Sequence, residues 1–191
     1  MYKIAISGKA NSGKNTLSNL ISSKLFNTFG KAELLAFADP IKKMIEIAYP
    51  DLPKEYLYGS SDLRSKIIPG AFKHGVPLSV RQLLIDLGND FGRLYKKDIW
   101  ISNFDFHFNK LVSQNTNVIV TDLRFRNEFD HLNSLDFYKI RIVRNESLRI
   151  NDLSETDQEL IKNSEFDCII DNNCSLSDLS EKVENICNAI V

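Results

Sequence analysis

Short apolar runs alternate along this chain with longer stretches in which apolar residues recur at helical spacing. Residues 2–7 predict a β-strand, and the apolar side chains of residues 14–26 follow at every third or fourth position, which predicts a helix. Residues 34–38 are apolar and few enough for a buried parallel strand. Asp39 and Pro40 follow, and they suit the N-cap and the first position of a helix, so a second helix is predicted to begin there.

The middle of the chain breaks this pattern and then resumes it. Residues 50–78 hold four of the five prolines and three of the eight glycines, which predicts an irregular insertion. Ser79, with Gln82 three positions later, then predicts a helix start. The apolar residues of this helix share one face and are expected to be buried: Val80, Leu83, Leu84, Leu87 and Phe91.

The second half of the chain repeats the alternation. The pattern predicts a helix over residues 97–111 and strands over residues 117–121, 138–143 and 167–170. Ser175 with Asp178 is expected to cap a C-terminal helix. Its inward face is predicted to consist of Leu176, Leu179, Val183, Ile186 and Ile190.

Strands that alternate with helices predict an α/β fold with three layers, in which helices cover both faces of a mostly parallel five-stranded sheet. The length of 191 residues fits one such domain. Ligands of these folds bind at the carboxyl ends of the strands. The residues that follow each predicted strand are therefore the candidates for a functional site.

The strongest candidate site follows the first predicted strand. There the chain has two glycines separated by four residues and followed by a lysine, in the run Gly8, Lys9, Ala10, Asn11, Ser12, Gly13, Lys14, Asn15, Thr16. This spacing between a strand and a helix is typical of a loop whose backbone N–H groups hold a polyphosphate. Lys14 could then reach the β- and γ-phosphates of ATP. The alternative is a glycine-rich turn that binds nothing.

The residue after this lysine is usually Ser or Thr, whose hydroxyl faces Mg²⁺. Here Asn15 takes that position and Thr16 follows, and either side chain could face the metal. Asp122, after the strand predicted at 117–121, could hold a water bound to the same metal. Arg124 and Arg126 follow closely and could neutralise charge on a transferred phosphoryl group. A surface ion-pair cluster is the alternative for this charged segment.

Several residues in the middle of the chain could hold an acceptor nucleotide. Asp39 either caps its helix or faces the acceptor. Arg81 lies off the apolar stripe and should share a helix face with Gly88, and its planar guanidinium suits a monophosphate. Asp90 and Trp100 could line the nucleoside pocket, although packing in the core is the simpler interpretation of Trp100.

Other candidates follow the last two strands. Arg144 comes directly after the strand predicted at 138–143. The polar segment 145–163 could close over ATP as a lid that excludes water. Asn172, after the last strand, either contacts the adenine of ATP or belongs to a turn.

Composition narrows the possible classes of protein. The formal net charge of −1 argues against a general nucleic-acid binder, and no apolar run is long enough for a membrane span. The chain also shows no pattern of a signal peptide. The three cysteines, Cys168, Cys174 and Cys187, match no zinc spacing and are expected to be reduced, as in a cytoplasmic protein.

Taken together, these segments resemble the phage-type deoxynucleoside monophosphate kinases, within the superfamily of P-loop nucleoside monophosphate kinases. The matching segments occur over most of the chain, at residues 7–16, 37–42, 80–88, 122–128, 143–144 and 153–155. The resemblance implies a single P-loop kinase domain over residues 1–191, with an acceptor-binding region at about 40–100 and a lid-like segment at 145–163.

The resemblance also implies transfer of the γ-phosphate of ATP to a deoxynucleoside 5′-monophosphate, with Mg²⁺. It implies that Lys14 and the loop bind ATP, with Arg144 on the donor side, and that Arg81 binds the acceptor. Asp122 and Arg124 would lie near the reacting atoms. It suggests a homodimer and a cytoplasmic location, in the host if a phage encodes the chain.

Two other functions stay open from the sequence. One is a P-loop kinase with a different acceptor, such as a modified base in DNA or a small phosphorylated metabolite. The other is a nucleotide-binding module without catalysis.

Overall fold

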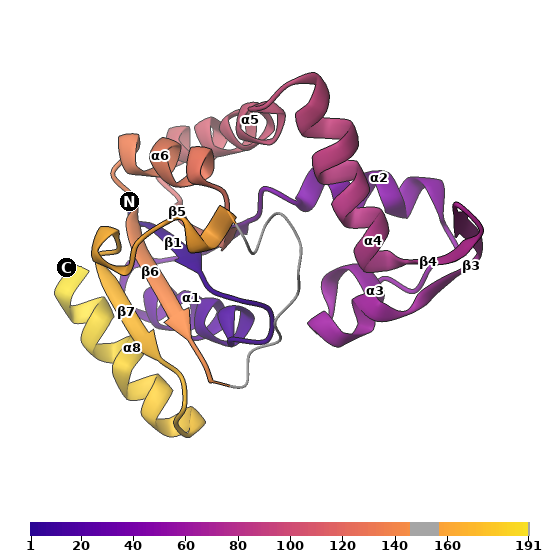
Figure 1. Ribbon diagram of the computed structural model, residues 1–191. Helices are drawn as coiled ribbons and strands as arrows, with labels where there is room; N and C mark the ends of the chain where they lie inside the picture. Colours follow the sequence, from indigo (N-terminus) through magenta and orange to yellow (C-terminus); the bar gives the residue numbers. More distant parts are fainter. Residues whose placement is uncertain (146–156, 191) are drawn as a thin grey trace. The chain divides into compact units, whose positions relative to one another are not determined.

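The computed structural model describes residues 1–145 and 157–190, which form two compact units (Figure 1). The first unit combines residues 1–37 with the described residues from 104 onward, and the second consists of residues 38–103. The unit boundary at residues 103 and 104 falls within α5 (Ile99–Ser113). The second unit therefore spans nearly the same residues as the region that the resemblance assigns to the acceptor.

The first unit is built on one sheet in the order β2-β5-β1-β6-β7. Its strands are β1 (Lys3–Ser7), β2 (Ala32–Leu35), β5 (Asn117–Leu123), β6 (Tyr138–Val143) and β7 (Cys168–Asp171). All four pairings are parallel, so the carboxyl ends of all five strands lie at the same edge of the sheet. The predicted parallel five-stranded sheet is confirmed.

Helices cover both faces of this sheet (Figure 1). On one face α1 (Lys14–Phe29) lies beside α8 (Leu176–Ile190), and they bury a cluster that includes Ile6, Leu17, Ile21, Ile140, Leu179 and Val183. The other face carries α6 (Arg126–Ser134) and the second half of α5, with an aromatic group that includes Phe104, Phe108 and Phe137. The three-layer α/β/α arrangement follows directly from these two apolar faces.

β2 differs from its prediction. It ends at Leu35, whereas the apolar run continued to residue 38, and it pairs only with β5 at an edge of the sheet. Leu34 is consequently 41% exposed, although the prediction was a buried strand. An apolar run does not distinguish an edge strand from a central one, because sheet order depends on pairing between distant segments.

Two helices of the first unit also differ from expectation. α6 was not predicted, since only Phe129 and Leu132 mark a buried apolar face among its nine residues. α8 is capped as predicted, because the Asp178 N–H donates to Ser175 Oγ and the Ser175 N–H donates to the Asp178 carboxylate. Leu176 is 63% exposed, however, so the buried face of α8 begins one turn later.

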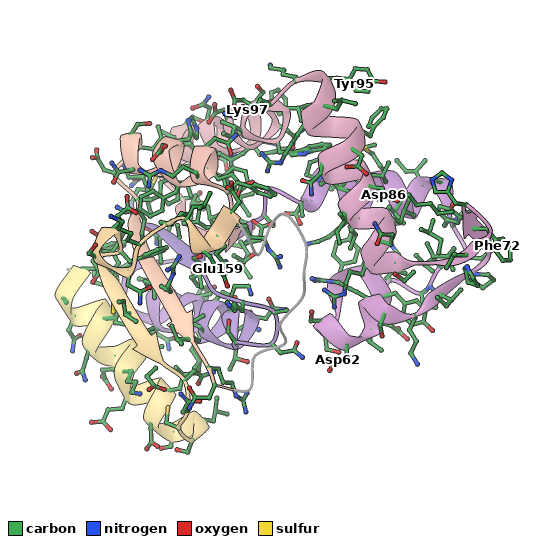
Figure 2. All side chains as sticks on the ribbon, viewed as in Figure 1. Asp62, Phe72, Asp86, Tyr95, Lys97 and Glu159 are labelled. Carbon is green, nitrogen blue, oxygen red and sulfur yellow. The ribbon has the colours of Figure 1, made fainter. Side chains whose placement is uncertain are left out.

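The second unit contains more regular structure than its proline content predicts. It contains α2 (Asp39–Ala48), α3 (Glu55–Tyr58), the 3₁₀ turn η1 (Ser61–Ser65), β3 (Ile67–Lys73), β4 (Val76–Ser79), α4 (Val80–Ile85) and the π-helix η2 (Asp86–Arg93). β3 and β4 form an antiparallel hairpin, with exposed Phe72 near its turn (Figure 2). Prolines are tolerated in a two-stranded hairpin because each strand has an edge where no ladder bond is lost. The prediction of an irregular insertion over 50–78 is therefore wrong.

The helix predicted from Ser79 begins there but changes its geometry. Ser79 Oγ accepts a hydrogen bond from the Gln82 N–H at 3.1 Å, which is the expected N-cap. From Asp86 onward the helix is a π-helix, and its wider turns rotate the later side chains away from their α-helical positions. Gly92 is buried as a result, whereas Phe91, predicted to be buried, is 51% exposed.

The π-helix gives a test of packing in the second unit. A Cβ atom on Gly92 would lie 2.1 Å from Cζ2 of the buried Trp100 ring. We expect Gly92→Ala to lower the free energy of unfolding by about 1–3 kcal/mol, because the rigid ring has to shift. Chemical denaturation followed by circular dichroism measures this change. Asp90→Ala, at a 66% exposed side chain of the same helix, should change stability by less than about 0.5 kcal/mol. Equal midpoints for the two variants would contradict this packing.

In the part of the chain that the structure describes, no helix combines the length and apolar character needed to cross a bilayer. The three cysteines are free thiols, with Cys187 buried and Cys174 exposed.

Candidate active site

The predicted phosphate loop connects β1, the central strand of the sheet, to α1. Asn11 and Gly13 have positive φ angles of 61° and 99°, a conformation that Asn and Gly adopt most readily. Gly13 directly precedes the first residue of α1. The loop therefore leads straight into a helix N-terminus, whose N–H groups and dipole favour an anion.

The two glycines are also required by close packing under the loop. A Cβ on Gly8 would lie 2.5 Å from the carbonyl oxygen of Ile142, and one on Gly13 would lie 2.4 Å from the side-chain nitrogen of Asn172. This nitrogen donates to the Ser12 carbonyl at 2.9 Å. The buried Asn172 amide thus supports the loop, a role that the sequence did not predict, and its contact with the adenine of ATP stays a prediction.

Two polar groups of the loop fit an anionic ligand. The Lys14 ammonium donates to the carbonyls of Gly8 and Lys9, the latter at 2.7 Å, and so lies against the loop. The Ser12 side chain is buried, and within the described residues its Oγ has no hydrogen-bond partner. A buried hydroxyl without a partner costs free energy, which a phosphate oxygen would recover. The loop thus fits a polyphosphate in shape, charge and hydrogen bonding.

A cavity of about 210 Å³ lies beside the loop, within the first unit. It is lined by the loop, the end of β6 and the segment after residue 157, namely Gly8, Lys9, Ser12, Arg141, Ile142, Val143, Arg144, Gln158, Glu159 and Asn163. Arg144, predicted on the donor side, is thus brought together with the loop. Most of the predicted lid, residues 146–156, and the family-like segment 153–155 lie outside the described residues.

The candidate magnesium ligands offer oxygen atoms, which Mg²⁺ prefers. Asn15 and Thr16 lie exposed in the first turn of α1. Asp122 lies within β5, which runs two residues beyond the predicted strand, and its Oδ1 accepts a hydrogen bond from the Phe37 N–H at 2.8 Å. The described residues contain no cluster of three or more Asp, Glu, His or Cys that could hold a metal by itself. Phosphate and water oxygens would therefore supply most of the ligands.

The charged segment after β5 serves local structure as well. The N–H groups of Arg124 and Phe125 both donate to Glu128 Oε2 at 3.0 Å, and Glu128 is only 2% exposed. This carboxylate satisfies N–H groups at the start of α6, where an acid is favoured. Sequence reasoning did not recognise Glu128 as a cap, although its position three residues after Phe125 is a helix-start signal.

Arg126 was predicted to bind the acceptor, but it belongs to an ion-pair cluster, which was the alternative. Its guanidinium lies 2.9 Å from Asp130 and 2.7 Å from Glu165, and these bonds raise the pKa of Arg126. The N–H of Lys162 and the Arg126 guanidinium lower the pKa of Glu165. Arg126 is therefore already engaged by two carboxylates of the first unit, which is the usual state of a charged surface segment.

In the second unit, Asp39 does not cap α2. Ala38 is the N-cap residue and makes no side-chain cap bond, while Asp39 lies in the first turn. The Asp39 carboxylate is 3.1 Å from the Lys42 ammonium. An acid in the first turn still interacts favourably with the helix dipole, which explains why the helix starts where Asp39 and Pro40 predict.

Arg81 lies on α4 and reaches the 3₁₀ turn η1. Its Nη2 donates to the Ser61 carbonyl at 2.7 Å and to Ser61 Oγ at 3.2 Å, so the position of the guanidinium is defined by another segment of the same unit. Arg81 is partly exposed. Because part of its side chain is accessible to solvent, Arg81 stays a candidate for binding a phosphate.

Gly88, Asp90 and Trp100 are the other acceptor candidates, and all three belong to the second unit. Gly88 is buried, and a Cβ atom there would lie 3.2 Å from the Ile41 side chain. The side chain that packs closely against Gly88 is therefore Ile41, whereas a ligand was expected to lie against this glycine. The buried Trp100 donates its indole N–H to the Gly88 carbonyl at 2.8 Å, which is core packing. Asp90 is 66% exposed and lies 3.9 Å from Lys73 of the hairpin. The packing of Trp100 agrees with the simpler of its two interpretations, and the π-helix explains the burial of Gly88, since that prediction assumed α-helical spacing.

Comparison with known proteins identifies the family. Residues 60–183 match the model of the family described as deoxynucleotide monophosphate kinase. The chain belongs to this family. The matched residues begin after the phosphate loop, so the loop and the family match are independent observations that agree. Family membership makes the chain a nucleotide-binding kinase and confirms the resemblance found in its sequence.

A viral relative supports the same assignment. A protein of Acanthamoeba polyphaga mimivirus, whose name proposes deoxynucleotide monophosphate kinase activity, is 27% identical over 193 residues, which cover 96% of this chain and 94% of the relative. Similar solved structures include a dephospho-CoA kinase from Campylobacter jejuni (16% identity, TM-score 0.47, 98% and 96% of the two chains). TT1252 from Thermus thermophilus is also similar (13% identity, TM-score 0.49, 100% of both chains).

Proposed function

We propose that this kinase transfers the γ-phosphoryl group of ATP to a deoxynucleoside 5′-monophosphate, which yields the diphosphate and ADP. The phosphate loop carries the proposal, because just before α1 it combines the Lys14 ammonium with the buried Ser12 hydroxyl, which has no hydrogen-bond partner in the described part of the chain. The family of the chain supports the nature of the acceptor.

The donor side of the proposed reaction uses the first unit. The loop N–H groups and Lys14 would bind the phosphates of ATP, and Arg144 lines the adjacent cavity. Mg²⁺ would be held by Asn15 or Thr16 and, through water, by Asp122, and it would neutralise charge on the phosphates. Arg124 follows β5 directly and would add a positive charge near the reacting atoms.

The acceptor side uses the second unit, where Arg81 is the proposed ligand of the monophosphate. A guanidinium binds phosphate oxygens in pairs, and the bonds to Ser61 hold this one in a defined orientation. Asp39 is a further candidate for the acceptor, with its carboxylate beside Lys42.

The proposed chemistry needs little from the protein besides alignment. An ionised oxygen of the acceptor phosphate attacks the γ-phosphorus, the bond from this phosphorus to the bridging β–γ oxygen breaks, and ADP leaves with the electron pair. Catalysis then consists of orienting the two substrates and neutralising negative charge spread over the phosphoryl group.

Release of ADP tests the proposal directly. Each common deoxynucleoside and ribonucleoside monophosphate is added in turn to the chain with MgATP, and ADP is measured by a coupled assay. We expect at least one deoxynucleoside monophosphate to stimulate ADP release at least about 100-fold over the acceptor-free rate, because the acceptor supplies the aligned nucleophile.

Duplex DNA and small phosphorylated metabolites serve as comparison acceptors in the same assay. Stimulation by one of these alone would reassign the acceptor. ATP binding without stimulation by any acceptor would instead indicate a nucleotide-binding module. Sedimentation of the same sample tests the homodimer, which stays a prediction.

A further inference from the structure

A glutamine in the segment after residue 157 reaches under the phosphate loop. Gln158 is 3% exposed, and its Nε2 lies 3.1 Å from Ser7 Oγ, 3.3 Å from the Gly8 carbonyl and 3.4 Å from the Leu123 carbonyl. These three acceptors mark the end of β1, the start of the loop and the end of β5. One buried amide thus connects the loop to the two central strands.

Gln158 and Lys14 share an acceptor. Both donate to the Gly8 carbonyl, the first through its amide and the second through its ammonium. If Lys14 turns from this carbonyl to a phosphate oxygen, the carbonyl loses the Lys14 donor, and the Gln158 amide is the donor that stays with it among the side chains of the described residues. A buried carbonyl that is left without any donor raises the free energy of the bound state. The Gln158 amide avoids this cost, because its bond to Gly8 stays in place.

The neighbours of Gln158 hold it in position. Arg141 Nη2 donates to the Gln158 carbonyl at 3.0 Å, and Arg141 Nη1 donates to the Ile161 carbonyl at 2.8 Å. The Arg141 guanidinium also stacks over the Phe166 ring, with its carbon 4.2 Å from the ring centroid. Near the surface, the Lys9 ammonium lies 2.6 Å from the carboxylate of Glu159, which is labelled in Figure 2. The segment after residue 157 is therefore attached to the loop at two adjacent residues.

We propose that Gln158 is a positioning residue, which holds the first carbonyl of the phosphate loop while Lys14 moves from this carbonyl to the phosphates of the nucleotide. The inference rests on the proposed function only in that the loop binds ATP. It assigns the segment after residue 157 a role in supporting the phosphate loop, which the polar composition of this segment did not predict.

Substitution of Gln158 tests the proposal through ATP binding. Gln158→Leu keeps the approximate size of the side chain and removes its donors. We expect the Kd and KM for ATP to rise about 5–10-fold, which corresponds to loss of one buried hydrogen bond, with the KM for the acceptor changed less than about twofold. Gln114→Leu is the matched control, since Gln114 is exposed in the same unit and its variant should bind ATP as the wild type does.

Gln158→Glu supplies a second readout that a purely structural role would not change. Its carboxylate would face the Gly8 and Leu123 carbonyls and can donate only when it is protonated. Burial and the facing carbonyl oxygens should raise the pKa of the new carboxyl well above its usual value, so its protonated fraction rises as the pH falls from about 8 to about 5.5. We therefore expect this variant to bind ATP more tightly at about pH 5.5 than at about pH 8, relative to wild type.

Isothermal titration with ATP, alongside thermal melts, separates the outcomes. Unchanged ATP affinity in a folded Gln158→Leu variant would overturn the proposal. If that variant does not fold, a pH-independent affinity of Gln158→Glu relative to wild type would overturn it equally. ATP titration needs no acceptor, so the result stands even if no deoxynucleoside monophosphate stimulates ADP release.

Discussion

Lys14→Ala is expected to lower kcat for phosphoryl transfer by about 100-fold or more, since it removes a preorganised positive charge from the site of developing negative charge. The loss should concern catalysis rather than folding. The Lys14 ammonium donates to the loop carbonyls of Gly8 and Lys9, whereas α1 is anchored in the core through Leu17 and Ile21. Steady-state kinetics together with a melting curve measure the two effects separately.

Lys24→Ala is the matched control for this variant. Lys24 lies on the same helix and pairs with Glu184 at the surface, at 2.7 Å, so its loss removes an equal charge away from the loop. This variant should retain activity within about twofold, because exposed ion pairs contribute little. A Lys14→Ala protein with the activity of Lys24→Ala would refute the assignment of the loop as the donor site.

Arg81→Ala is expected to raise the KM for the acceptor by about 10–100-fold, which is the loss of a charge-assisted bond to a phosphate. The KM for ATP should change less than about twofold, since Arg81 is proposed to bind the acceptor and the loop is proposed to bind ATP. Initial rates with each substrate varied in turn give both constants.

Two further variants distinguish binding from local stability. Ser61→Ala removes the hydroxyl that accepts from Arg81 at 3.2 Å and keeps the carbonyl that accepts at 2.7 Å. We expect it to have a smaller effect on the KM for the acceptor than Arg81→Ala. Arg81→Lys keeps the charge without the planar fork and should recover only part of the affinity. Equal rises of both KM values in Arg81→Ala would place Arg81 elsewhere in the mechanism.

The phosphate loop illustrates what local sequence can predict. Its function depends on backbone conformation over a few residues, with positive φ at Asn11 and Gly13, followed directly by a helix. Residue types reflect these conformational requirements directly. The spacing of Gly8, Gly13 and Lys14 was therefore sufficient to predict a tight loop that leads into a helix. The parallel sheet was predictable for a similar reason, because alternating strands and helices can hardly be connected in another way.

The acceptor region shows where local patterns fail. The helix from Ser79 was predicted with one uniform period, but a π-helix from Asp86 rotates the later side chains. No residue pattern in this helix predicted the change from α-helix to π-helix. Gly92 allows the Trp100 ring to pack against the helix, and that contact joins residues whose closeness depends on the fold of the unit. Gly88 and Phe91 were misplaced for this one reason.

The fold class, the place of the glycine-rich loop between two elements and the family could be predicted from the residues alone, because each depends on short-range spacing or on the order of elements. Which polar side chains support that loop became apparent only in the folded chain. Asn172 and Gln158 reach it from 160 and 150 residues away in the chain, and Arg126 forms an ion pair with Glu165, 39 residues away. The physical reason is that a buried polar group is satisfied by whichever partner the fold brings near, and sequence separation carries no information about that partner.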